Sequence, residues 1–214
     1  MQARAVALDM LLLILEEKKP SHIVFARELS KYPEMEKKER AFARRLATGV
    51  IERQITLDFL IGHYSKTRVE KLKPMIREIL RMGLYQLYYM EVPPSAACNE
   101  AVKLTKKRGL SGLSGYVNGV LRAAARDGLC LEKEFSSCGE EELLSLRYSI
   151  PRWLVEKFLS WYGREESERI FSAFFAPPTF TVRVNVSKGE VSSCREHLAR
   201  AGILAREGEV FGAL

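Results

Sequence analysis

The sequence has few residues of the kinds that bind metal ions or form disulfide bonds. It contains four cysteines and three histidines in 214 residues, and no cysteine pair has the Cys-x-x-Cys spacing of zinc and redox sites. Free thiols of this kind are typical of the reducing cytoplasm. We therefore expect a cytoplasmic protein without a metal site.

The sequence also has no apolar run long enough to cross a bilayer. The stretch from Leu8 to Leu15 has the composition of a signal-peptide core, but Asp9 interrupts it and no small-residue cleavage site follows. Its apolar residues recur at helical spacing. This pattern predicts an amphipathic core helix and no contact with a membrane.

An acidic excess is missing as well. The chain carries 34 lysines and arginines against 27 acidic residues, which gives a net charge of +7. The basic residues are spread along the whole chain rather than gathered in a tail. Such a balance is compatible with a nucleic-acid partner but does not require one.

Residues 2–126 have an almost wholly helical pattern. Pro74 is well placed as the first residue of a helix that ends near Met90. Gly83 lies inside the apolar stripe of this helix and lowers its helix propensity, which predicts that another helix packs closely there. The stripe consists of Ile76, Ile79, Leu80, Gly83, Leu84 and Leu87. We predict a mainly α-helical bundle over residues 1–127.

The second part of the chain changes character. Residues 128–139 lack periodicity and are expected to be a linker. Residues 140–214 are expected to form a helical connector and the beginning of an α/β module. Pro151 opens a connector helix that ends at Gly163. The apolar residues that this helix is expected to bury are Leu154, Phe158 and Trp161.

Two strands are expected in the α/β module. Residues 180–186 alternate apolar and polar side chains, which is the clearest strand pattern of the sequence. Residues 203–210 form a weaker second strand, and a helix closed by Gly202 precedes it. These elements predict a smaller α/β segment that is incomplete within the sequence.

Basic side chains on the predicted helices are candidates for binding phosphates. Arg77, Arg81 and Tyr85 are four residues apart and therefore share one helix face, where the tyrosine ring could stack on an unpaired base. For Arg81 we favour a structural ion pair with a carboxylate such as Glu100. For every basic row the alternative is a solvated face without a ligand.

The other candidates for RNA contact lie in rows or stand alone. The rows are Lys37, Arg40 and Arg44, and Lys103, Lys106 and Lys107 followed by Arg108. The single candidates are Arg4 and Arg122 in the bundle and Arg183 and Asn185 on the predicted strand. The glycine-spaced loop 109–115 is expected to be a flexible connection. Trp153 and Trp161 are expected to be core residues rather than base-stacking platforms.

Several segments resemble known families in order and spacing. Arg4–Ala7, Glu78–Leu87, Pro94–Val102 and Val117–Arg122 resemble the NusB-like RNA-binding domain. Tyr148–Leu154, Tyr162-Gly163, Pro177-Pro178 and Val182–Asn185 are similar to the region that follows this domain in rRNA 5-methylcytosine methyltransferases of the RsmB/Sun type. The resemblance implies a NusB-like bundle followed by the start of an RRM-like α/β module.

The resemblance also implies methyl transfer from S-adenosylmethionine to carbon 5 of a cytosine in 16S rRNA. The family uses one cysteine in a Thr-Cys context as nucleophile and a second in a Pro-Cys context for product release. None of the four cysteines here is preceded by Thr or Pro; the preceding residues are Ala97, Leu129, Ser137 and Ser193. We therefore assign no catalytic and no cofactor-binding residue, and expect S-adenosylmethionine to bind a catalytic domain outside this sequence.

The resulting hypothesis is an RNA-binding N-terminal portion of an rRNA cytosine methyltransferase, inactive by itself. Its expected partners are 16S rRNA and the methyltransferase domain. One alternative is a NusB-type antitermination factor, which acts in the regulation of transcription. The other alternative is a helical protein-interaction module that does not bind RNA.

Overall fold

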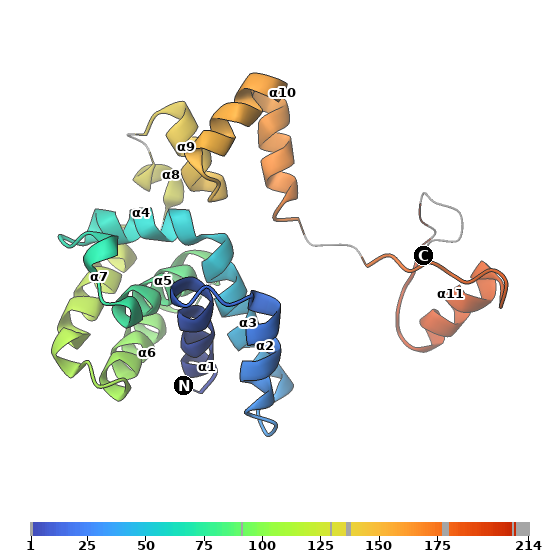
Figure 1. Cartoon of the computed structure of the whole chain (residues 1–214), viewed down its shortest axis with the longest axis horizontal. Helices are drawn as coiled ribbons and strands as arrows, with labels where there is room; N and C mark the ends of the chain where they lie inside the picture. The colour runs from blue at the N-terminus through green and yellow to red at the C-terminus, as the bar shows by residue number, and fades with distance from the viewer. Residues whose placement is uncertain are drawn as a thin grey trace. The chain divides into compact units, whose positions relative to one another are not determined.

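The computed structural model describes residues 2–90, 92–128, 130–135, 138–176, 180–206 and 208. The chain divides into two compact units, Met1–Phe171 and Ser172–Leu214 (Figure 1). The three-part division predicted from the sequence, with a linker at 128–139, stays a prediction. No helix in the described ranges is long and apolar enough to span a membrane.

The first unit is helical, as predicted. Its first elements are α1 (Gln2–Leu11), the π-helical turn η1 (Leu12–Glu16), α2 (Ser21–Ser30), α3 (Lys37–Glu52), α4 (Gln54–Tyr64), the 3-10 turn η2 (Val69–Lys71) and α5 (Pro74–Tyr89). The later elements are α6 (Pro94–Lys107), the 3-10 turn η3 (Ser111–Leu113), α7 (Ser114–Arg126), α8 (Leu131–Glu134), α9 (Glu140–Tyr148) and most of α10 (Arg152–Ala173). The second unit contains α11 (Val191–Arg200).

Helix α5 is the centre of the bundle and packs against α1, α3, α4, α6 and α7. It begins at Pro74, whose missing amide hydrogen costs nothing at the first helical position. All six residues of the predicted apolar stripe are buried, so the stripe is confirmed. The helical periodicity of the sequence therefore identified the helix that organises the fold.

Gly83 allows α7 to approach α5 closely. A Cβ atom built at this position would lie 2.7 Å from both terminal methyl groups of Leu121 on α7. The close contact predicted from this glycine is therefore confirmed. A second glycine, Gly49 on α3, makes room in the same way for the ring of Tyr85 on α5.

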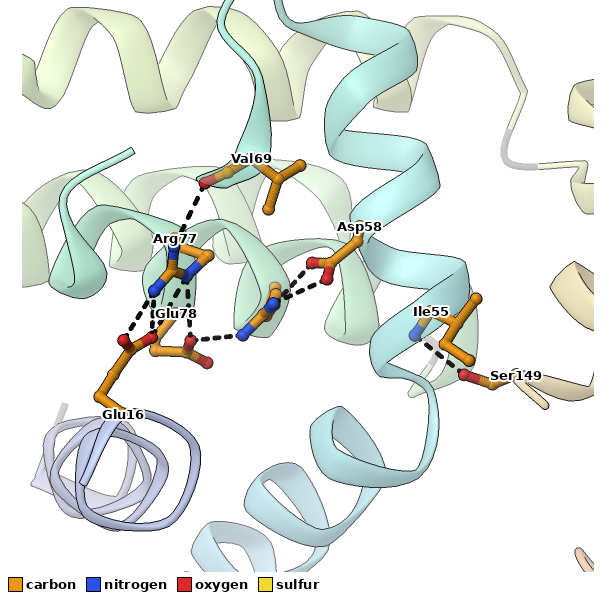
Figure 2. A network of polar contacts seen from close by, with 8 residues as sticks. Glu16, Ile55, Asp58, Val69, Arg77, Glu78 and Ser149 are labelled. Carbon is orange, nitrogen blue, oxygen red and sulfur yellow. Dashed lines mark hydrogen bonds and ion pairs between the residues drawn. The ribbon is translucent and has the colours of Figure 1, made fainter. Parts of the chain in front are cut away.

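A network of charged side chains ties α5 to its neighbours (Figure 2). Arg77 binds both carboxylate oxygens of Glu16, at the end of η1, with an Nη2–Oε2 distance of 2.7 Å. Arg81 donates to both oxygens of Asp58 on α4, each at 2.7 Å, and to Glu78 Oε1 at 2.6 Å. The prediction that Arg81 forms a structural ion pair is therefore confirmed.

The partner predicted for Arg81 is wrong. Glu100 instead bonds Lys103 on its own helix at 2.9 Å, while Asp58 and Glu78 hold Arg81. Arg81 is buried, and a buried guanidinium requires carboxylates with good geometry on the helices packed directly against it. Helix α4 supplies one through tertiary packing that the sequence does not reveal.

Glu78 is the most deeply buried member of the network, with 0% exposure. The pKa of its carboxyl group is raised to about 8, mainly by burial; Arg81 and Arg77 oppose the rise, and the nearby carboxylate of Glu16 contributes to it. Its Oε2 atom has no hydrogen-bond partner in the described part of the chain. We infer that Glu78 keeps its proton at neutral pH.

Three hydrogen bonds join the C-terminal end of α9, and Ser149 directly after it, to the start of α4. Thr56 Oγ1 donates to the Leu146 carbonyl at 2.6 Å, and Arg53 Nη1 donates to the Arg147 carbonyl at 2.9 Å. Ser149 Oγ accepts the amide hydrogen of Ile55 at 3.0 Å (Figure 2). The contact joins α9 to the bundle through backbone groups that would otherwise need water.

Helix α10 is interrupted at Gly163, where φ is +71°, so the predicted helix end is confirmed. The predicted burial of Trp153 and Trp161 is wrong, because these side chains are 60% and 61% exposed. Both lie in a row at four-residue spacing with Lys157, whereas the buried Val155 is two residues, or about 200°, away around the helix. The helix buries that other face.

The second unit differs from the prediction. The predicted helix is present as α11, and Gly202 (φ +79°) follows its end. The predicted strand at 180–186 is wrong as a continuous element, because Arg183 alone among the described residues forms a β-bridge and Phe180 is 97% exposed. Alternation does not provide the neighbouring strand that a ladder needs. Residues 203–206 are irregular, and 207, 209 and 210 lie outside the described residues.

We predict that Gly83→Ala destabilises the protein by up to about 2 kcal/mol. The new methyl group collides with Leu121, and overpacking costs roughly 1–3 kcal/mol, against a gain of about 1 kcal/mol in helix propensity. Urea unfolding measures the difference. The control is Gly119→Ala, at an exposed position of α7 with open space, where only the gain is expected. If Gly83→Ala costs as much in a Leu121→Ala background, the collision is not the cause.

We also predict that Glu78 makes stability fall as pH rises from about 5 to about 8. In this window the unfolded chain releases the proton of Glu78, whose ordinary pKa is 4.5, while the folded chain retains it. The folded state therefore binds more protons, and higher pH favours unfolding. Urea midpoints at pH 5, 6, 7 and 8 should fall less steeply for Glu78→Gln. The exposed control Glu70→Gln should keep the wild-type slope; equal slopes for all three proteins would contradict the assignment.

Candidate nucleic-acid interface

The basic row of α3 lies on the exposed side of that helix. Lys37 and Arg44 are exposed, and the Arg44 guanidinium lies 5.8 Å from the ring centroid of Phe25. Arg40 is half-buried and donates to the Tyr32 carbonyl at 2.8 Å. Stacking on an aromatic ring orients Arg44 without neutralising its charge. Lys37 and Arg44 are therefore available to a polyanion, whereas Arg40 also holds the preceding loop.

Arg4 connects α1 to two other helices. Its Nε atom donates to Gln86 Oε1 on α5 at 2.7 Å, and its guanidinium lies 4.8 Å from the ring centroid of Phe42 on α3. Burial lowers the pKa of Arg4, and the carboxylate of Glu100 opposes this effect. Arg4 is therefore a half-buried residue that packs between α1, α3 and α5.

The basic row of α6 divides into free and engaged cations. Lys106 and Lys107 are exposed and form no ion pair within the described part of the chain. Lys103 is paired with Glu100 at 2.9 Å. Arg108, at the end of the helix, donates to Asp9 Oδ1 on α1 at 2.6 Å. Two adjacent lysines at the end of α6 therefore remain for a ligand.

The face predicted from Arg77, Arg81 and Tyr85 is mainly an internal contact. To bind a phosphate, Arg77 would have to release Glu16, to which it is bound by three hydrogen bonds. Tyr85 is half-buried against α3 and stacks on Tyr89 at 5.2 Å. Burial raises the pKa of Tyr85, and the Arg45 guanidinium opposes the rise.

The last three candidates are exposed. Arg122 lies on the outer side of α7, and its charge acts on the buried thiol of Cys98. Arg183 lies in the second unit. Asn185 lies there too, and its Oδ1 atom accepts hydrogen bonds from the amide and the hydroxyl group of Ser187 at 3.2 and 2.6 Å. These bonds close a local turn, which is a common role of asparagine.

Two further arginines, which lie near Tyr85 and Tyr89, were not predicted from the sequence as candidates for RNA contact. Arg45 is exposed beside Tyr85, and Arg53 lies 5.2 Å from the ring centroid of Tyr89. Arg45 directly follows the candidate Arg44, and that Arg-Arg pair was a usable signal. Arg53 gave none, because its aromatic partner is 36 residues away along the chain by the numbering.

Taken together, these positions fit the binding of phosphates rather than a catalytic or metal site. Among the candidates predicted from the sequence, those on α3, α6 and α7 that are exposed and form no ion pair in the described part of the chain are Lys37, Arg44, Lys106, Lys107 and Arg122. No group of three or more possible metal ligands occurs among the described residues. Cations held on stable helices can bind a polyanion by releasing its counterions.

Comparisons with known families divide the chain into two matches. The NusB family model matches residues 1–126. A model described as the Methyltr_RsmF/B-like, ferredoxin-like domain matches residues 150–213. The second match covers the segment in which an α/β module was expected, although the described residues there contain almost no strand.

Two similar proteins match different lengths of the chain. The chain is 31% identical over 209 residues to the "Probable ribosomal RNA small subunit methyltransferase B" of Bacillus subtilis, covering 97% of this chain and 46% of that protein. It is also 36% identical over 104 residues to the "Transcription antitermination protein NusB" of Nitratiruptor, covering 48% of this chain and 75% of that protein. The chain thus spans less than half the length of its methyltransferase relative.

A solved structure has the same bundle fold. It is the crystal structure of the antitermination factors NusB and NusE in complex with dsRNA, with a TM-score of 0.54 and 21% identity. The match covers 58% of this chain and 94% of that one. At this identity the likeness concerns the fold alone.

Proposed function

The chain belongs to the NusB family and continues into an RsmF/B-like ferredoxin-like domain, and from this membership we propose that it is the RNA-binding portion of a small-subunit rRNA cytosine methyltransferase. Its expected ligand is small-subunit (16S) rRNA, and its expected place is the cytoplasm, where that RNA is found. The methyl-transfer step is assigned to a catalytic domain that works with this portion.

The observation that supports this proposal best is the order of the two domains in one chain. The NusB match ends at residue 126, and the ferredoxin-like match begins at residue 150. The similarity to the Bacillus subtilis methyltransferase extends over 97% of the chain, across both domains. A protein with the NusB bundle alone would account for the first match but not for the second.

The exposed cations give this portion a physical way to bind RNA. Lys106 and Lys107 at the end of α6, and Lys37 and Arg44 on α3, carry charges that no carboxylate in the described ranges neutralises by an ion pair. Each contact with a phosphate releases counterions, so binding should weaken as salt rises. Contacts of this kind position an RNA without reading its sequence.

The described residues do not fit S-adenosylmethionine or the family's catalytic cysteines. No glycine-rich loop follows a strand in the described ranges, and no cysteine has the Thr-Cys or Pro-Cys context. Burial raises the pKa of the thiols of Cys98 and Cys138, which is opposite to what a thiolate nucleophile needs. We therefore expect no methyl transfer by this chain alone.

A second candidate is an antitermination factor that binds RNA together with a protein partner. The NusB family match and the relative from Nitratiruptor favour it. That relative aligns with 48% of this chain, which leaves the ferredoxin-like match without a role. The two candidates differ in their RNA, because the first prefers a small-subunit rRNA fragment and the second a leader RNA with its protein partner.

We predict salt-dependent binding of the full chain to a fluorescently labelled small-subunit rRNA fragment. Fluorescence anisotropy should show Kd rising steeply between 50 and 200 mM salt, as is typical of about 6–10 phosphate contacts. In Lys106→Gln/Lys107→Gln the slope of log K against log salt should fall by roughly 1.5, because two contacts are lost. The matched control, Lys66→Gln/Lys71→Gln, removes two exposed lysines outside the candidate rows and should keep the slope.

Three results would contradict parts of the proposal. Absence of binding at low salt would refute RNA binding and favour the alternative of a helical protein-interaction module. An equal loss of slope in both double variants would show that net charge, and not the end of α6, determines binding. Transfer of a labelled methyl group from S-adenosylmethionine to the rRNA by this chain would refute its inactivity.

A further inference from the structure

Helix α10 exposes both tryptophans of the protein in one row. Trp153 and Trp161 are 60% and 61% exposed, and Lys157 lies between them at four-residue spacing. The Lys157 Nζ atom is 6.0 Å from the ring centroid of Trp153 and 5.8 Å from that of Trp161. We call these three residues the tryptophan row. Its two tryptophans are far more exposed than large aromatic side chains usually are.

The helix under the tryptophan row is firmly held. The ring of Trp161 packs against Phe158 at 6.0 Å, and Phe158 packs against the fully buried Phe171 at 5.2 Å. Val155, two residues from Trp153, is fully buried in the same small core. The helix that carries the indole rings is therefore anchored in a packed core of the first unit, and the rings are positioned before any ligand arrives.

The tryptophan row contains a cation without an ion-pair partner, whereas the neighbouring arginines of α10 are paired with carboxylates. Arg152 is paired with Glu141 at 2.8 Å and with Glu156 at 3.1 Å, and Arg164 is paired with Glu140 at 2.9 Å. Lys157 has no carboxylate partner within the described part of the chain, and its ammonium group faces two rings instead. The row thus combines two flat apolar faces with one uncompensated positive charge.

This combination fits single-stranded RNA better than an apolar protein surface. Unpaired bases stack on aromatic rings, and a cation between the rings can bind a backbone phosphate. A purely apolar partner would bury the Lys157 charge without compensation, which is costly. The two tryptophans are eight residues apart, or about 12 Å along the helix, whereas stacked bases are about 3.4 Å apart. Bases that stack on both rings therefore cannot be stacked neighbours of one strand, which favours an unpaired, unstacked RNA.

We propose that the tryptophan row of α10 is a second RNA contact, separate from the cations of the NusB bundle, that stacks unpaired bases of a single strand on Trp153 and Trp161 with a phosphate on Lys157. The proposal rests on the proposed function, because it takes the RNA to be the ligand already bound by the bundle. It assigns the row to the parts of that RNA that are not in a duplex.

Tryptophan fluorescence tests the proposal directly, because the protein has two tryptophans and both lie in the row. The full chain is titrated with an unstructured single-stranded oligonucleotide and with the same strand annealed to its complement. Anisotropy of the labelled strand measures binding in parallel. The single strand should quench the fluorescence, and the duplex should bind with little quenching.

Variants separate stacking from charge. Trp153→Ala and Trp161→Ala should each weaken single-strand binding by about 5- to 150-fold, as expected for one lost base–aromatic stack, and should leave duplex binding unchanged. Trp161→Phe should keep part of the affinity because it retains a ring. Ile23→Ala, which removes a side chain that is 55% exposed on α2, is the matched control and should have no effect. Circular dichroism checks that each variant is folded.

The outcomes distinguish this proposal from the proposed function. Binding by anisotropy without quenching, and with wild-type affinity in both alanine variants, would overturn the tryptophan row as an RNA contact and leave the bundle as the RNA site. Absence of binding by anisotropy would overturn both. A concentration-dependent fluorescence shift without RNA, lost in Trp153→Ala together with a dimer in sedimentation, would assign the row to protein association instead.

Discussion

The bundle depends on the neutralisation of two arginines that α5 carries into its interior. Arg77 and Arg81 point from the central helix toward η1 and α4, and each meets a carboxylate from one of these elements. Once such charges are buried, losing one partner is far more costly than never having had the pair. Glu16 and Asp58 therefore determine where η1 and α4 can lie, and the apolar stripe of α5 fills the space that remains. Glu78 lies between them, and because we infer that it keeps its proton, Glu16 and Asp58 alone supply the negative charge that the two arginines need.

The sequence was most informative for features that a single helix determines through its own residues. The α5 stripe, its start at Pro74 and the close approach at Gly83 all follow from helical spacing and from the properties of proline and glycine. It was less informative for contacts that depend on a second element of the fold. The partner of Arg81 is Asp58, 23 residues earlier, and the alternation at 180–186 does not create a paired strand. No local pattern contains those neighbours.

The same limit applies to the candidate RNA contacts. Sequence patterns grouped cations by helix face, and the structure sorts them by the carboxylates that other helices bring near. Arg77 and Arg108 hold distant elements together, while Lys106 and Lys107 stay free. The tryptophans were misjudged for a related reason. Their apolar character suggested a core, but Lys157 in the middle of their row was the better guide, because a lysine is rarely buried without a partner.

The contact between α4 and the C-terminal end of α9 has a consequence for the modularity of the chain. The Thr56 hydroxyl is fully buried, and both it and the Ile55 amide find their partners beyond residue 126, where the NusB family match ends. A fragment cut at that boundary would leave a hydroxyl and a helix-start amide without those partners. The end of α9 and Ser149 thus cap the start of a bundle helix. A recombination event that exchanged the bundle alone would leave these polar groups without their hydrogen-bond partners.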